Sequence, residues 1–96
     1  MEELETYDIV SVRDQLAVVI ESDLLPPDDA IVVIPLFRDY PAITKLNPTI
    51  GFCDDAFVLA TRMIASVRRN TVKKVGTARG QRDEITRAID ILMSGV

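Results

Sequence analysis

The sequence contains no histidine and only one cysteine. Histidine is the side chain best suited to proton transfer near neutral pH and the commonest nitrogen ligand for metals, so a serine or cysteine nucleophile here would lack its usual base. The single thiol, Cys53, excludes an intrachain disulfide and suits a reducing compartment. Apolar runs such as Leu16 to Ile20 fall far short of the roughly 20 residues that a helix needs to cross a bilayer. We therefore expect no membrane span.

Glycine-rich phosphate-binding loops are also missing. Gly76 and Gly80 stand four residues apart without the Gly-Lys-Ser/Thr ending of a P-loop, so no nucleotide cofactor is expected. Asp54 and Asp55 are neighbours, but no further ligand pattern accompanies them, and we interpret them as turn residues and not as a metal site. The first residues are acidic where a secretory signal is basic and then apolar. We expect a cytoplasmic protein with no cofactor and no metal.

What is present is the composition of an ordinary globular domain, with 48% hydrophobic and 27% charged residues among 96, and we expect one domain over residues 1–96. Charge is unevenly placed: residues 1–55 hold twelve acids and three bases, and residues 56–96 hold eight bases and three acids. The basic half has two interpretations, a phosphate-binding surface or a contact for an acidic protein. The net charge of −4 and the few aromatic side chains favour the second, so no direct nucleic-acid binding is expected.

The first two thirds of the chain predict short strands. Residues 4–10, 16–21 and 31–37 are rich in strand formers, a polar hairpin loop is expected over 11–15, and residues 49–62 read as a hairpin around a turn at 53–55. Pro35 indicates a bend, because proline lacks the amide that a sheet needs. Leu24 and Leu25 are adjacent and precede two prolines, so they cannot both point inward from an extended chain. We expect at least one to be exposed and to make a contact.

From residue 80 on the hydrophobic period becomes helical, which predicts a helix over 81–93 ended by Gly95. Its apolar stripe consists of Ile85, Ala88, Ile89 and Leu92. Ile91 and Met93 lie off this stripe, and we interpret them as part of a homodimer interface. The expected fold is mainly β, with five or six short strands followed by one C-terminal helix.

Several segments together carry a family resemblance. They are VIESDLL at 19–25, VVIPL at 32–36, LNP at 46–48, ATRMIASV at 60–67, RDEI at 82–85, AIDIL at 88–92 and the final Gly95-Val96. In this order and spacing they resemble the CcdB family of plasmid and chromosomal toxins. The resemblance implies a strongly bent antiparallel sheet of SH3-like barrel form, as in the CcdB, Kid and MazF toxins, with a small extra sheet and a C-terminal helix, assembled as a homodimer.

The resemblance also implies an activity that uses no catalytic residues. Family members bind the dimerisation region of the DNA gyrase A subunit, trap gyrase on cleaved DNA, and are neutralised by a CcdA-like antitoxin whose disordered part folds onto the toxin. Carried over by position, the gyrase-binding residues are Leu24, Leu25, Asp90, Ser94, Gly95 and Val96. The candidate antitoxin-binding segment is a polar loop made of Asp8, Ile9, Val10, Ser11, Val12, Arg13 and Asp14.

The match departs from the best-known plasmid members at two of these positions. Those members carry tryptophan where this chain has Ser94 and asparagine where it has Asp90. Ser94 is expected to open a short tail after the helix, because a segment beyond a helix stop usually has few buried contacts. Two alternative functions remain open: a MazF/Kid-like endoribonuclease that uses arginine and carboxylate pairs, and a non-toxic homologue that only binds antitoxin.

Overall fold

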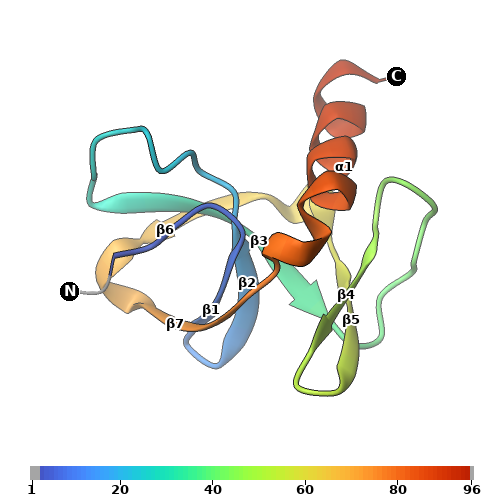
Figure 1. The fold of residues 1–96 in the computed structure, drawn as a ribbon, viewed down its shortest axis with the longest axis horizontal. Helices are drawn as coiled ribbons and strands as arrows, with labels where there is room; N and C mark the ends of the chain where they lie inside the picture. The colour runs from blue at the N-terminus through green and yellow to red at the C-terminus, as the bar shows by residue number, and fades with distance from the viewer. Residues whose placement is uncertain (1–2, 96) are drawn as a thin grey trace.

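The structure, a computed structural model, describes residues 3–95 (Figure 1). Its strands are β1 (Asp8–Val12), β2 (Gln15–Val19), β3 (Ala30–Phe37), β4 (Thr49–Phe52), β5 (Asp55–Leu59), β6 (Ala65–Arg68) and β7 (Val72–Thr77). Short 3₁₀ helices occupy Thr61–Met63, Arg69–Thr71 and Arg79–Gln81, and helix α1 spans Arg82–Ser94. The described chain is thus mainly β with a C-terminal helix, as expected, although it has one or two strands more than the sequence predicted.

The strands form one strongly curled antiparallel sheet, a half-barrel, in the order β4-β5-β3-β2-β1-β7, with β6 paired to β3. Strand β3 connects the two parts of the sheet. Its first residues pair with β6 and β2, whereas Leu36 and Phe37 pair with β5 (Figure 1). The partner changes at Pro35, where the sequence predicts a bend, and the Pro35 carbonyl accepts a hydrogen bond from the Ala60 amide at 3.0 Å.

Two hairpins turn more tightly than the sequence predicted. The connection between β1 and β2 is only Arg13 and Asp14, with φ of 50° and 68°, and the one between β4 and β5 is Cys53 and Asp54, with φ of 52° and 63°. Positive φ at both central residues is the geometry of a two-residue turn whose twist matches that of the strands. The predicted loop over 11–15 is therefore too long, because the strands continue to the turn itself.

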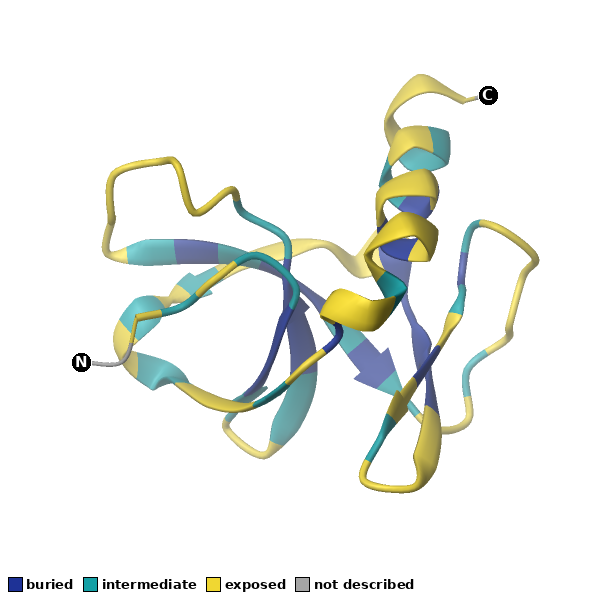
Figure 2. Cartoon of the chain, in the orientation of Figure 1, coloured by how far each residue is buried: buried dark blue, intermediate teal, exposed yellow. Residues whose placement is uncertain are grey.

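The buried apolar residues form two clusters. Figure 2 shows that buried residues are concentrated in the strands and in the first turns of α1. Neighbouring residues of one strand point to opposite faces, so Ile9 enters one cluster and Val10 the other. Helix α1 contributes Ile85 to the cluster that contains Ile9, Val18 and Ile34. This contact fixes the first turns of the helix on the sheet and leaves the last turns beyond it.

The helix is displaced by one residue from its predicted range of 81–93. Gln81 belongs to the preceding 3₁₀ helix, and its side chain is engaged with β4, donating to the Thr49 carbonyl at 2.7 Å and accepting from the Gly51 amide at 3.1 Å. Ser94 is the last helical residue and not the start of a tail, since its hydroxyl donates to the Asp90 carbonyl at 2.5 Å. Gly95 ends the helix with a φ of 71°, as predicted.

Within residues 3–95, no helix is long and apolar enough to cross a membrane.

Candidate functional site

The C-terminal end of α1, residues 90–95, projects from the sheet, and we call it the helix end (Figures 1 and 2). Asp90, Ser94 and Gly95 are exposed there, so three predicted gyrase-binding residues lie close together on one element. Met93 is 75% exposed, and Ile91 is half-buried. Val96, the remaining predicted contact at this end, lies outside the described residues.

The helix end also carries negative charge. Its last turn carries no basic side chain, while the carboxylate of Asp90 lies one turn from the end. Backbone carbonyls at a helix C-terminus carry a partial negative charge, which attracts cations. An apolar side chain, Met93, thus stands beside a site that favours a basic group from a partner.

The second predicted contact lies in the connection between β2 and β3, whose exposed part, residues 22–29, we call the leucine loop. Leu24 is 91% exposed and Leu25 is 56% exposed, so both leucines are exposed and not only one. The Leu25 amide donates to the Ser22 carbonyl at 3.2 Å, which closes a tight turn with the leucines at its outer side. Exposed adjacent leucines are uncommon on a monomer's surface unless they mark a contact site.

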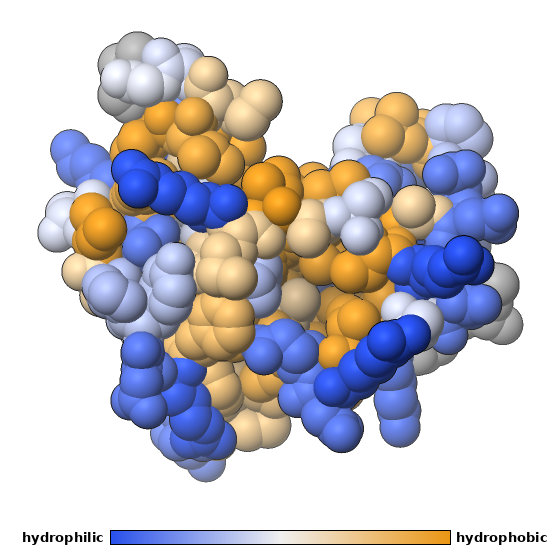
Figure 3. All heavy atoms as spheres, turned by 180° about the vertical axis from the view of Figure 1, so that it is seen from behind, coloured by the Kyte–Doolittle hydropathy of each residue, from blue (hydrophilic) through white to orange (hydrophobic). Residues whose placement is uncertain are grey.

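The structure does not bring the two groups of predicted gyrase-binding residues together in one chain. The helix end and the leucine loop are separate projections in Figure 1, and Figure 3 shows a depression between two raised ends of the surface, with apolar side chains along it. Exposed large apolar residues outside the two projections include Met63 and Ile64, which follow β5 at the 3₁₀ helix that contacts α1.

The predicted polar loop over residues 8–14 is wrong for most of its length. Asp8, Ile9 and Val10 are buried in β1, which is hydrogen-bonded to β2 on one side and to β7 on the other. These three side chains face the protein interior and are not accessible to an antitoxin. The prediction failed because aspartate is usually a loop residue, whereas Asp8 is buried and accepts a hydrogen bond from the Glu5 amide at 2.7 Å. Ser11 and Val12 are half-buried, and Arg13 and Asp14 are exposed at the turn, so an antitoxin contact stays a prediction for these four.

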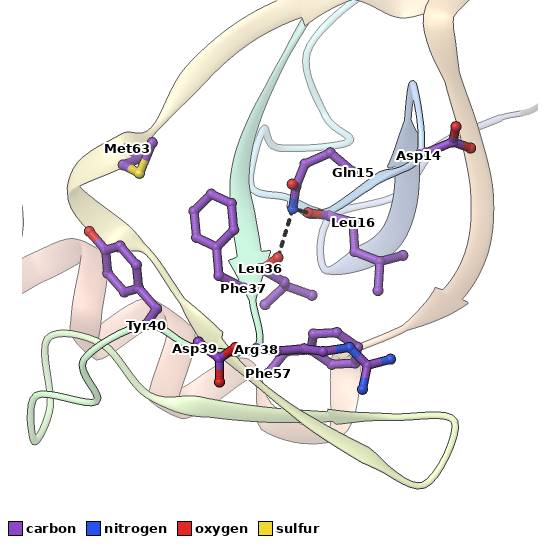
Figure 4. A pocket seen from close by; sticks show the side chains of 10 residues that line it. All are labelled: Asp14, Gln15, Leu16, Leu36, Phe37, Arg38, Asp39, Tyr40, Phe57 and Met63. Carbon is purple, nitrogen blue, oxygen red and sulfur yellow. Dashed lines mark hydrogen bonds between the residues drawn. The ribbon is translucent and has the colours of Figure 1, made fainter.

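A pocket of about 660 Å³ opens beside this turn (Figure 4). Its aromatic wall includes Phe37 and Tyr40, whose ring centroids are 5.4 Å apart. Two of its polar side chains are engaged within the protein: the Gln15 side-chain amide donates to the Leu36 carbonyl at 2.7 Å, and the Arg38 guanidinium lies 5.0 Å from the centre of the Phe57 ring. Sequence reasoning missed this pocket, because its residues come from four separate stretches of the chain that only the fold brings together.

Arg38 also forms an ion pair with Asp55 at 3.0 Å. Among the described residues, no three Cys, Asp or Glu side chains gather where they could hold a metal ion. The free thiol of Cys53 is exposed in the β4–β5 turn. The lining of the pocket includes the rings of Phe37, Tyr40 and Phe57 and the carboxylates of Asp14 and Asp39.

The uneven charge along the sequence is explained in part by ion pairs inside the molecule. Three basic residues of the C-terminal half contact acids of the N-terminal half: Arg69 with Glu21 at 3.5 Å, Lys74 with Asp8 at 3.4 Å, and Arg79 with Glu5. Five other basic residues of that half are exposed, namely Arg62, Arg68, Lys73, Arg82 and Arg87. Among the described residues these five form no ion pair with an acid, so they are the strongest candidates for contact with an acidic partner.

The half-barrel and its projecting helix define a small β protein whose most exposed large apolar side chains, Leu24 and Met93, lie on projections, as is typical of a protein that acts by binding other proteins. A comparison with family models gives a match to the CcdB protein family over residues 6–95. The chain therefore belongs to the CcdB family, whose members are toxins of toxin–antitoxin systems. No curated protein matches the sequence at a significant level.

Proposed function

We propose that this protein is a toxin that binds the DNA gyrase A subunit as a homodimer in the cytoplasm, without a catalytic step, and that a CcdA-like antitoxin neutralises it. Family membership supports the class of toxin. The observation that supports gyrase binding is the exposure of Asp90, Ser94 and Gly95 together at the helix end. These are positions at which family resemblance implies the gyrase contact.

The chemistry of the helix end suits such a contact. Asp90 and the carbonyl end of the helix favour a basic side chain of the partner. A charged group of this kind is typical of the polar rim of a protein interface. Methionine is flexible and polarizable, which suits Met93 to an apolar contact between two subunits.

A homodimer would present the helix ends and the leucine loops, which are separate in one chain, to a single partner. A two-fold axis presents the same patch on both subunits, so two helix ends and two leucine loops would face one partner together. Ile91 and Met93 remain the proposed dimer contacts, and Met63 and Ile64 are further exposed apolar residues at the 3₁₀ helix that contacts α1. The dimerisation region of gyrase A is itself two-fold symmetric, which matches this arrangement.

Antitoxin binding is proposed at the β1–β2 turn, around Arg13 and Asp14, and at the five exposed basic residues of the C-terminal half. An acidic segment that is disordered when free would fold onto this surface. Because exposed charges are screened by salt, its affinity should fall as the salt concentration rises. An affinity that does not change between low and high salt would remove the basic residues from the proposed contact.

Growth on expression tests the proposed target. Expression should arrest a bacterium with normal gyrase A and spare a matched strain whose gyrase A carries an altered dimerisation region. Arrest of both strains, together with cleavage of RNA by the purified protein, would instead assign an endoribonuclease. Growth of both strains, with antitoxin still bound, would assign a non-toxic homologue.

A further inference from the structure

The leucine loop contains no buried residue, so its shape is not set by the hydrophobic core. The loop is nevertheless tied to the rest of the molecule at both ends. At its start the Thr6 hydroxyl donates to the Glu21 carbonyl at 2.9 Å and accepts from the Asp23 amide at 3.1 Å. Inside it, the Leu24 amide donates to the Ser22 hydroxyl at 3.2 Å.

Arg69 is the residue that contacts both ends of the loop. Its guanidinium lies 3.5 Å from the carboxylate of Glu21, just before the loop, and its Nε donates to the Asp28 carbonyl at 2.7 Å. Its backbone amide donates to the Asp29 carbonyl, also at 2.7 Å. One side chain therefore bridges two backbone segments seven residues apart.

The setting of these contacts makes them stronger than ordinary surface contacts. The side chains of Arg69 and Glu21 are only 14% and 17% exposed, so solvent screens their attraction less than it would at the open surface. Arg69 also lies in the wall of a hollow of about 580 Å³ beneath the loop, whose lining includes Val19 and Ile31. The guanidinium fork suits this bridge, because its several donors can reach a carboxylate and a carbonyl at once.

We propose that Arg69 is a positioning residue that closes the leucine loop and holds Leu24 and Leu25 in the geometry that meets the partner. This inference rests on the proposed binding to gyrase A. Holding a loop in its bound shape before binding removes the cost of ordering it during binding. Arg69 thus contributes to affinity without touching the partner.

The test compares Arg69→Ala with Arg68→Ala. The control removes the same charge at the adjacent position. Arg68 also lies beside Asp28 and Asp29, but among the described residues its exposed side chain forms no hydrogen bond or ion pair with the loop. Its backbone carbonyl, which the change leaves in place, accepts a bond from the Thr71 hydroxyl. Backbone ¹⁵N relaxation of the free protein measures the order of the Leu24 and Leu25 amides. Titration calorimetry with the purified dimerisation segment of gyrase A measures affinity.

In Arg69→Ala we expect the order parameters of both leucine amides to fall below about 0.6, the value of a flexible backbone. Affinity for the gyrase segment should fall about tenfold, as the loop must then be ordered on binding. Arg68→Ala should match the unmodified protein in both measurements. Arg69→Lys, which keeps the charge but loses the Nε donor, should lie between them.

A double-mutant cycle separates positioning from general destabilisation. If Arg69 acts through the loop, Leu24→Ala should weaken binding less in the Arg69→Ala background than in the unmodified protein. Where Arg69→Ala does not fold, Glu21→Gln weakens the same bridge and is measured in its place. Additive effects, or a loop that stays ordered in the variant, would overturn the proposal.

The two measurements also separate this inference from the proposed function. If the unmodified protein does not bind the gyrase segment, the proposed target is wrong, and Arg69 does not present the leucines to gyrase. The relaxation measurement still decides whether Arg69 orders the loop. If binding occurs and a mobile loop binds with unchanged affinity, gyrase binding stands and positioning by Arg69 is overturned.

Discussion

The helix end and the leucine loop both expose apolar side chains on projections, but different interactions hold them in place. The helix end continues from a helix whose first turns are anchored by Ile85 and Ala88, both buried. The leucine loop has no such anchor and is held by hydrogen bonds and one ion pair at its ends. The shape of the first thus depends on the hydrophobic core, and that of the second on a few polar contacts, which predicts different responses to mutation.

The largest expected effect follows from removing the core anchor of the helix. Ile85→Ala leaves a cavity in the cluster that joins α1 to the sheet, and it should lower the free energy of unfolding by about 2–5 kcal/mol. Urea unfolding followed by circular dichroism measures the change. Ile43→Ala, at a half-exposed position in a connecting loop, is the control and should stay within about 0.5 kcal/mol of the unmodified protein. Equal losses in both variants would mean that the helix is not held by Ile85.

A smaller effect is expected at the stop of the helix. Gly95 has a φ of 71°, where an added Cβ strains the backbone, so Gly95→Ala should cost about 1–2 kcal/mol. Gly80→Ala is the matched control, because a Cβ there meets no atom within 4 Å and its φ is not positive. Gly95→Asn should recover much of the loss, since asparagine tolerates the left-handed region. If thermal unfolding gave Gly80→Ala a lower melting temperature than Gly95→Ala, this account of the helix end would be contradicted.

The hydrogen bonds that hold the leucine loop should contribute less to the free energy of unfolding than Ile85 or Gly95. Thr6→Val keeps the shape of the side chain and removes its hydroxyl, which loses the bonds to Glu21 and Asp23 and should cost about 0.5–1.5 kcal/mol. Thr49→Val, at an exposed threonine of β4, serves as the comparison. Chemical denaturation gives the two values, and hydrogen exchange should show the loss confined to the loop. Faster exchange throughout the sheet would show that Thr6 supports the core and not only the loop.

The smallest effect on stability, within about 0.5 kcal/mol, is expected for Ser94→Trp, because Ser94 is exposed at the helix end. Its effect should appear in binding: a tryptophan supplies the aromatic anchor that plasmid members of the family carry at this position, and tryptophan is enriched among the residues that dominate interfaces. We expect tighter binding to the gyrase segment by calorimetry. Weaker binding of a stably folded variant would remove Ser94 from the contact.

The sequence predicted well those elements with a strong apolar signal. Strand β3 and helix α1 were found within a residue of their observed ends. The helix has a regular apolar period, whereas β3 is a near-continuous run of apolar strand formers that contributes to both buried clusters. Strands β6 and β7 were missed. Most of their residues are exposed, so they lack an alternating pattern, and they are strands only because β3 and β1 offer hydrogen-bonding edges.

For the predicted binding residues, too, the sequence indicated exposure better than burial. The exposure of at least one of Leu24 and Leu25 was inferred correctly, because neighbouring side chains of an extended chain point in opposite directions. The burial of Asp8 was not inferred, since its polar side chain gives no sign of the bonds to Glu5 and Lys74 that satisfy it inside the fold.

By itself the sequence determined the class of fold and the family, since both depend on apolar spacing and on residues in a fixed order. The tertiary structure alone decided which charges are available to a partner. Arg69, Lys74 and Arg79 look like members of one basic surface in the sequence, yet each meets an acid from the N-terminal half. These contacts join positions 48 to 74 residues apart, and an ion pair forms only where folding brings two charges within a few ångströms, which residue order does not specify.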